Sequence, residues 1–129
     1  MSAPAATSKP QLAPDPFTSA CPTREILDRI GDRWTVLVVS SLEDGPMRFS
    51  ELGRRIEGIS QKMLTQTLRG LERDGLVTRT VQAAVPPRVD YALTDLGRTL
   101  TPVIAALDAW ARAHMSDVTA SRSAYDAQT

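Results

Sequence analysis

The sequence of 129 residues lacks the features that several classes of protein require. It has one cysteine, Cys21, which excludes an intramolecular disulfide framework. No apolar run approaches the roughly 18–20 residues of a membrane span, and no apolar stretch follows a basic start as in a secretory signal. These absences predict a cytoplasmic protein in a reducing compartment, without a membrane partner.

The residue constellations of an enzyme are also missing from the sequence. It contains no glycine-rich phosphate loop, no cluster of metal ligands and no arrangement of nucleophile, base and acid. The only histidine, His114, stands alone near the C-terminus, where a metal or catalytic role is not expected. We therefore expect no enzymatic activity, no catalytic residue, no cofactor and no metal site.

Net charge is absent overall but not locally. The formal charge of the chain is zero. The segment from Arg48 to Arg88, however, holds eight basic and four acidic residues, which gives it a net charge of +4 and leaves −4 for the remainder. A basic centre in a neutral chain fits a surface that contacts phosphates, although uneven scatter of surface charge would give the same count.

Turn residues and hydrophobic periodicity divide the first third of the chain. Residues 1–20 hold four prolines among Ala, Ser and Thr and should form a disordered or draped arm. Pro22 fits the first position of a helix that ends at Gly31. Asp32 should cap a second helix. The core stripe of that second helix is Trp34, Leu37, Val38 and Leu42.

The segment Gly58–Gly75 predicts the helix around which the chain is organised. Ser60 should cap its start, and Gly75 suits the left-handed position after its end. Leucines at i, i+4 and i+7 form an apolar face. The opposite face offers groups that could meet base edges and phosphates in a major groove, although a solvated surface would look the same. The candidate contact residues are Ser60, Gln61, Lys62, Thr65, Gln66 and Arg69.

The neighbours of this segment predict a winged helix-turn-helix. A short helix around Leu52 precedes it, and the turn between the two contains glycine. Residues 76–81 and 89–93 alternate as strands do, and the residues between them, with Pro86-Pro87, form the tip of a hairpin, the wing. Four arginines are candidates for phosphate contacts: Arg54, Arg55, Arg79 and Arg88.

A long apolar helix should follow the hairpin. Thr94 caps its start, and Pro102 should kink the helix or restart it. Its apolar face suggests that a second subunit covers it. Candidate residues for a dimer interface or an effector pocket are Trp34, Leu100, Ile104, Leu107 and Trp110. We expect residues 21–115 to form the domain and residues 116–129 to fray as a tail. The predicted fold class is mainly α with a small β-hairpin (α+β), dimerising through its terminal helices.

Short motifs follow one another along the chain in a specific order and spacing. They include Cys21-Pro22, Ile30-Gly31, Arg48-Phe49, Gly58-Ile59-Ser60, Gly75-Leu76-Val77, Pro86-Pro87-Arg88-Val89-Asp90-Tyr91 and Leu96-Gly97. Together, from Cys21 to about Trp110, they resemble the HxlR-type branch of the MarR-like winged-helix transcription regulators. The resemblance implies a homodimer that binds a palindromic operator in double-stranded DNA, with the helix Gly58–Gly75 in successive major grooves. Gln82 and Ala84 stand where the family pattern has an aromatic and an acidic residue.

Cys21 has the setting of a reactive thiol. It precedes a helix N-terminus, whose dipole favours the thiolate, and Arg24 lies three residues on. Such a thiol is oxidised or attacks electrophiles such as quinones and aldehydes. Members of the family that the chain resembles sense such compounds through a cysteine at the matching place. The alternative is an inert, half-buried cysteine.

The sequence thus favours a sequence-specific DNA-binding transcriptional regulator that acts as a homodimer and responds through Cys21 to an oxidant or electrophile. Two alternatives stay open. One is a winged-helix module that binds protein instead of DNA, because the fold does not fix the function. The other is a regulator controlled by a small ligand bound between the dimer helices.

Overall fold

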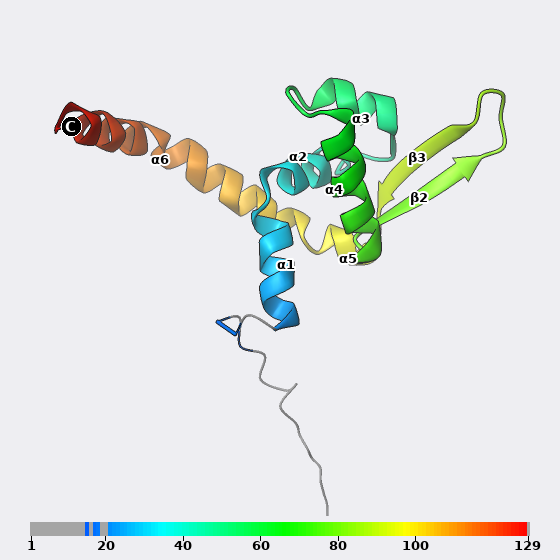
Figure 1. Ribbon diagram of the computed structural model, residues 1–129, viewed down its shortest axis with the longest axis horizontal. Helices are drawn as coiled ribbons and strands as arrows, with labels where there is room; N and C mark the ends of the chain where they lie inside the picture. Colours follow the sequence, from blue (N-terminus) through cyan, green and yellow to red (C-terminus); the bar gives the residue numbers. More distant parts are fainter. Residues whose placement is uncertain (1–14, 16, 19–20, 129) are drawn as a thin grey trace, which may run out of the picture.

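The computed structural model describes Asp15, Phe17, Thr18 and residues 21–128 (Figure 1), so most of the arm expected over residues 1–20 lies outside the described residues. The elements are α1 (Pro22–Gly31), α2 (Arg33–Ser41), β1 (Met47–Arg48), α3 (Phe49–Arg55), α4 (Gln61–Arg73), β2 (Val77–Gln82), β3 (Arg88–Leu93), α5 (Asp95–Arg98) and α6 (Thr101–Gln128). The predicted fold class, mainly helical with a small antiparallel sheet and a wing, is confirmed.

Side-chain caps set the helix starts where the sequence places them. The Asp32 carboxylate accepts a hydrogen bond of 2.7 Å from the backbone N–H of Trp34. The Ser60 hydroxyl accepts one of 3.0 Å from the backbone N–H of Met63 at the start of α4. Such caps satisfy N–H groups that have no partner within the helix. After α4, Gly75 has a φ of 77°, which a residue with a side chain adopts only with strain.

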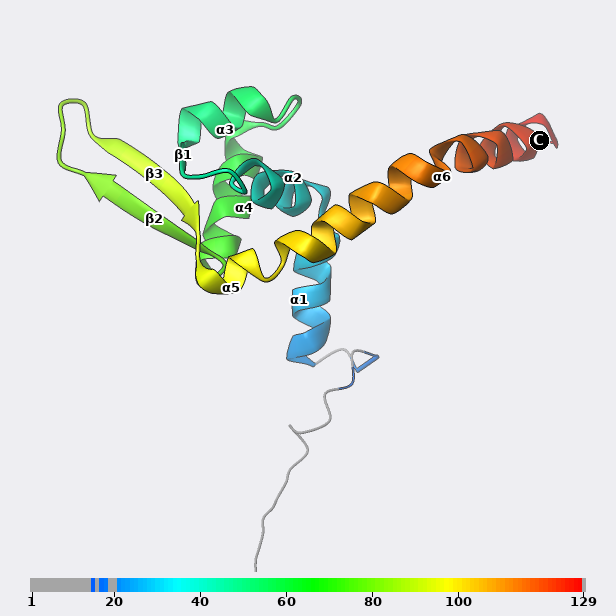
Figure 2. The ribbon, with the colours of Figure 1, turned by 180° about the vertical axis from the view of Figure 1, so that it is seen from behind.

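The sheet holds the wing against the helices. Its strand order is β1-β3-β2, and both pairs are antiparallel. Val77 pairs with Leu93 at the base of the wing, and Gln82 pairs with Arg88 near its tip. Arg48 of the short strand β1 pairs with Asp90, so the residue before α3 is fixed to β3. Figures 1 and 2 show β2 and β3 extending away from the helical body as one long hairpin.

The core is built around α4. Its leucines Leu64, Leu68 and Leu71 are at most 1% exposed and pack in one cluster with residues of α2, α3 and the sheet. Burying a leucine fully stabilises a fold by about 1.5–3 kcal/mol relative to leaving it exposed. The apolar half of α4 therefore fixes the helix rotation, and the polar half is left to face outward.

One residue of the predicted α2 core stripe is not in the core. Leu37 is 42% exposed, and Val39 is buried in its place. The reason is that α2 packs against α4 on one side and α6 on another. The buried face of α2 is thus centred on Val38 and Val39 and turned away from Leu37.

The C-terminal helices differ from the expectation in length. Pro102 restarts the helix, since α5 ends at Arg98 and α6 begins at Thr101. Residues 116–128, which we expected to fray, form the last part of α6. No glycine or proline follows Pro102, so nothing in the sequence interrupts helix propagation there. In Figures 1 and 2, α6 leaves the domain and projects into solvent on its own.

Candidate nucleic-acid interface

The outer face of α4 consists of Gln61, Lys62, Thr65, Gln66 and Arg69. These five side chains line one hollow together with Phe49 from α3. The structure therefore brings together five of the six contact residues proposed for this segment, and the sixth, Ser60, caps the helix directly before them. Within the described residues, no carboxylate forms an ion pair with Lys62 or Arg69. Their charges are thus available to a phosphate or a base edge.

Arg79 of β2 adds to the same surface. It lines a second hollow with Thr65, Arg69 and Glu72 of α4 and Tyr91 of β3. Because Thr65 and Arg69 line both hollows, the second hollow continues the outer face of α4 toward the wing. The structure places Arg79 close to the foot of the wing, beside α4.

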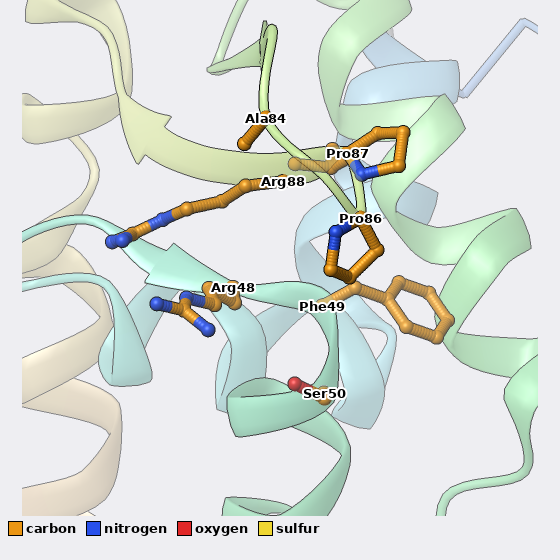
Figure 3. Close-up of a pocket in the computed structure, with 8 residues that line it drawn as sticks. Arg48, Phe49, Ser50, Ala84, Pro86, Pro87 and Arg88 are labelled. Carbon is orange, nitrogen blue, oxygen red and sulfur yellow. The ribbon is translucent and has the colours of Figure 1, made fainter.

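A third hollow, the wing-tip hollow, lies between the start of α3 and the tip of the wing (Figure 3). It is lined by Arg48, Phe49 and Ser50 around the start of α3 and by Ala84, Pro86, Pro87, Arg88 and Val89 of the wing. Phe49 lines this wing-tip hollow as well as the α4 hollow, so it joins the two. Arg48 and Phe49 are not among the site residues predicted from the sequence. The available signal was the position of Arg48, a basic residue directly before the first helix of the helix-turn-helix.

Arg88 forms an ion pair within the wing. Its Nε lies 3.1 Å from Oδ1 of Asp90, and the Arg88 side chain is 44% exposed. The Gln82 amide donates a hydrogen bond of 2.7 Å to Oδ2 of the same carboxylate. Asp90 therefore ties the two strands of the wing together, and Gln82, which departs from the family pattern, takes part in this cross-strand contact.

The two arginines of α3 line none of these three hollows. Arg55 lines a different hollow, with residues of the turn between α2 and β1 such as Asp44 and Gly45. Arg54 is exposed. The hollows therefore do not join either arginine to the outer face of α4.

Cys21 lies immediately before α1 and is 8% exposed. Burial by itself raises the pKa of its thiol. Hydrogen bonds from the Thr23 hydroxyl and from neighbouring backbone N–H groups outweigh burial, so the pKa lies below its ordinary value. This favours the thiolate, the form of cysteine that reacts with oxidants and electrophiles.

The candidate interface residues fall into two groups. Leu100 and Ile104 are 8% and 4% exposed and belong to the core of this chain, which corrects their assignment to a dimer interface. They lie where the start of α6 packs on α2, and Ile104 also lines a small hollow there with Val39 and Thr101. Leu107 and Trp110 lie beyond that contact and are 52% and 60% exposed. Trp34 is partly buried against the core, with the Arg33 guanidinium 4.5 Å from its ring centre.

In the part of the chain that the structure describes, no three His, Cys, Asp or Glu side chains gather as metal ligands would. Among the described helices, none combines the length and apolar character that crossing a bilayer requires.

Comparisons with known proteins agree with this geometry. A model of the HxlR-like helix-turn-helix family matches residues 29–119. The HTH-type transcriptional regulator YtfH of Escherichia coli strain K12 is 43% identical over 106 residues, which cover 82% of this chain and 84% of that protein.

Solved structures extend the similarity to the fold. The protein ytfH from Salmonella typhimurium has a TM-score of 0.80 at 41% identity, covering 86% of this chain and 99% of that one. The redox regulator HypR in its reduced form has a TM-score of 0.71 at 39% identity, covering 77% of this chain and 98% of that one.

Proposed function

Because this chain belongs to the HxlR-like helix-turn-helix family and is a transcriptional regulator, not an enzyme, we propose that it binds a palindromic operator as a homodimer in the cytoplasm. The main support for this proposal is the outer face of α4. Its amide, hydroxyl and cationic groups line one hollow, and the other face of the helix is buried by three leucines. Gln can pair with adenine and Arg or Lys with guanine in a major groove.

The wing supplies the second contact in this proposal. Arg48 and Arg88 both line the wing-tip hollow, and Phe49 connects this hollow to the outer face of α4. We assign α4 to base contacts, and Arg48, Arg88 and Arg79 to phosphates. Phosphate contacts fix the register of a protein on the duplex, and base contacts give the specificity.

The homodimer rests on an apolar stripe of α6. Val103, Leu107 and Trp110 are spaced i, i+4 and i+7, so they share one face of the helix, and each is 49–60% exposed. An exposed apolar stripe of this kind is stabilised when a partner covers it. A second copy of the chain would bring a second α4 onto the DNA. A two-fold dimer reads two half-sites about one helical turn apart, roughly 10–10.5 base pairs, or multiples of that distance.

We further propose that Cys21 makes the regulator responsive to oxidants or electrophiles. The lowered pKa of its thiol and the similarity to the redox regulator HypR support this. Oxidation by a peroxide would remove two electrons and two protons from two thiols and reduce the peroxide to water. The second thiol would be Cys21 of the other subunit or a small thiol, because the chain has no second cysteine.

Hydroxyl-radical footprinting on the DNA upstream of the gene and its neighbours tests the proposal. Two protected half-sites related by two-fold symmetry, one helical turn or a multiple apart, are expected. A quinone should change the protection of the wild-type protein and not that of Cys21→Ser.

A single asymmetric footprint would exclude the homodimer. Absence of any footprint would favour the protein-binding alternative. A quinone response that survives in Cys21→Ser would exclude the thiol and favour a ligand bound between the helices.

A further inference from the structure

An ion pair joins the first helix to the end of the recognition helix. Arg29 Nε of α1 lies 2.8 Å from Oδ2 of Asp74, the residue that caps the C-terminus of α4. The two side chains are only 30% and 21% exposed. A pair that is largely shielded from solvent is screened less by salt than a surface pair, and it holds its geometry better.

Gly70 makes room for this contact. It lies inside α4, one helical turn before Asp74, and no left-handed conformation requires glycine there. Glycine inside a helix is less stable than alanine. A β-carbon at Gly70 would overlap the guanidinium of Arg29. The missing side chain thus lets the guanidinium lie directly on the backbone of α4 while its Nε pairs with Asp74.

Helix α1 packs on α2, which itself packs on α4 and α6. None of the residues of α1 is buried, and Ile26 and Ile30 are its hydrophobic residues that are partly buried against the core. Figure 1 shows α1 projecting from the helical body in a different direction from the wing. The contact of Arg29 with Asp74 therefore ties the C-terminal end of α4 to the pair α1 and α2, on which α6 also packs.

We propose that Arg29 is a positioning residue for DNA binding. Its guanidinium lies against the backbone at Gly70 and pairs with Asp74, and this contact fixes α4 relative to α1. In the dimer this sets the spacing between the two recognition helices. The three hollows of the candidate interface include neither Arg29 nor Gly70 nor Asp74, so this contact acts on the geometry of binding and not on the DNA itself. The inference rests on the proposed homodimeric operator binding.

Gly70→Ala separates positioning from stability. Alanine favours the helix, so the melting temperature should stay the same or rise, while the added methyl group displaces the Arg29 guanidinium. Affinity for the full palindrome should fall about tenfold, within the range of coupling between sites. Affinity for an isolated half-site should not change, because the outer face of α4 is intact. The matched control is Gly31→Ala, where a β-carbon meets nothing within 4 Å.

A double-mutant cycle isolates the ion pair. Arg29→Met and Asp74→Asn should each lower full-site affinity, and the double variant should be no weaker than the weaker single variant, because both remove the same contact. Full-site affinity of Gly70→Ala equal to that of the wild type, an equal loss on half-sites, or additive effects of the two single variants would each overturn the proposal. Failure of the homodimer itself appears separately, as equal binding of full and half sites by the wild-type protein, and it would overturn both inferences.

Discussion

The Thr94 hydroxyl donates a hydrogen bond of 2.6 Å to the carbonyl oxygen of Gly75. The backbone N–H of Thr94 donates a second bond, of 3.1 Å, to the carbonyl oxygen of Leu76. The same hydroxyl accepts a bond of 2.9 Å from the backbone N–H of Gly97. One residue therefore joins the end of the recognition helix to the start of the C-terminal helices, so the two cannot move independently at this point.

Gly97→Ala tests how tight this junction is. A β-carbon at Gly97 would overlap the backbone carbonyl oxygen of Leu76, which cannot swing aside as a side chain can. We expect the free energy of unfolding to fall by about 1–3 kcal/mol, as for other overpacked sites. Urea denaturation at one fixed protein concentration measures it. Gly31→Ala, which meets no neighbouring atom, should stay within about 0.5 kcal/mol of the wild type. Equal losses in the two variants would contradict the assigned clash.

Arg48→Ala tests the wing-tip hollow. Removing a phosphate contact should weaken binding to all DNA sequences similarly and reduce the slope of log K against log salt concentration by about 1. Fluorescence anisotropy at several salt concentrations measures both. Arg98→Ala is the control, since Arg98 is exposed on α5 and lines none of the three hollows. An unchanged slope in Arg48→Ala would remove Arg48 from the interface.

Trp110→Ala tests the apolar stripe of α6. If the stripe is the dimer interface, loss of this large, exposed ring should weaken self-association by about 30-fold or more, equivalent to the ~2 kcal/mol of an interface hot spot. Sedimentation equilibrium gives the dissociation constant. Val85→Ser removes a still more exposed apolar side chain at the wing tip and should leave the dimer unchanged. A dimer that tolerates Trp110→Ala would place the interface elsewhere.

The pH dependence of alkylation tests the thiol. Hydrogen bonds lower the pKa of Cys21, so the thiolate persists to lower pH than in an ordinary cysteine. The rate of reaction with iodoacetamide should rise with pH and level off earlier than for a free cysteine. Thr23→Val removes the hydroxyl hydrogen bond and should move the midpoint to higher pH. Burial at 8% exposure slows the reaction at every pH, and the hydrogen bonds outweigh its upward effect on the pKa. A midpoint that stays in place in Thr23→Val would exclude Thr23 as the cause.

Local signals predicted most of the fold. Ser60 and Thr94 cap helices as expected, and Gly75 has the left-handed conformation, because capping and turn chemistry depend on residues close in sequence. The leucine spacing of α4 identified its buried face, and therefore also the face that is left for a ligand.

Contacts between distant residues could not be predicted in the same way. Leu37 and Val39 differ in burial because several helices, α4 and α6 among them, pack on α2, which no pattern within α2 reveals. Leu100 and Ile104 have the same apolar spacing as Leu107, yet only the first two meet the core. The pairing of Arg29 with Asp74 spans 45 residues, and the sequence analysis assigned no role to either.

The most direct test of the account is the salt dependence of binding to the upstream DNA by the wild-type protein and by Lys62→Ala. Lys62 belongs to the outer face of α4, and within the described residues no carboxylate pairs with it. The account predicts specific binding with a steep negative salt slope, and a loss of about 1–3 kcal/mol of affinity for the operator in Lys62→Ala. Equal binding of both proteins to operator and unrelated DNA would show that α4 does not read the DNA.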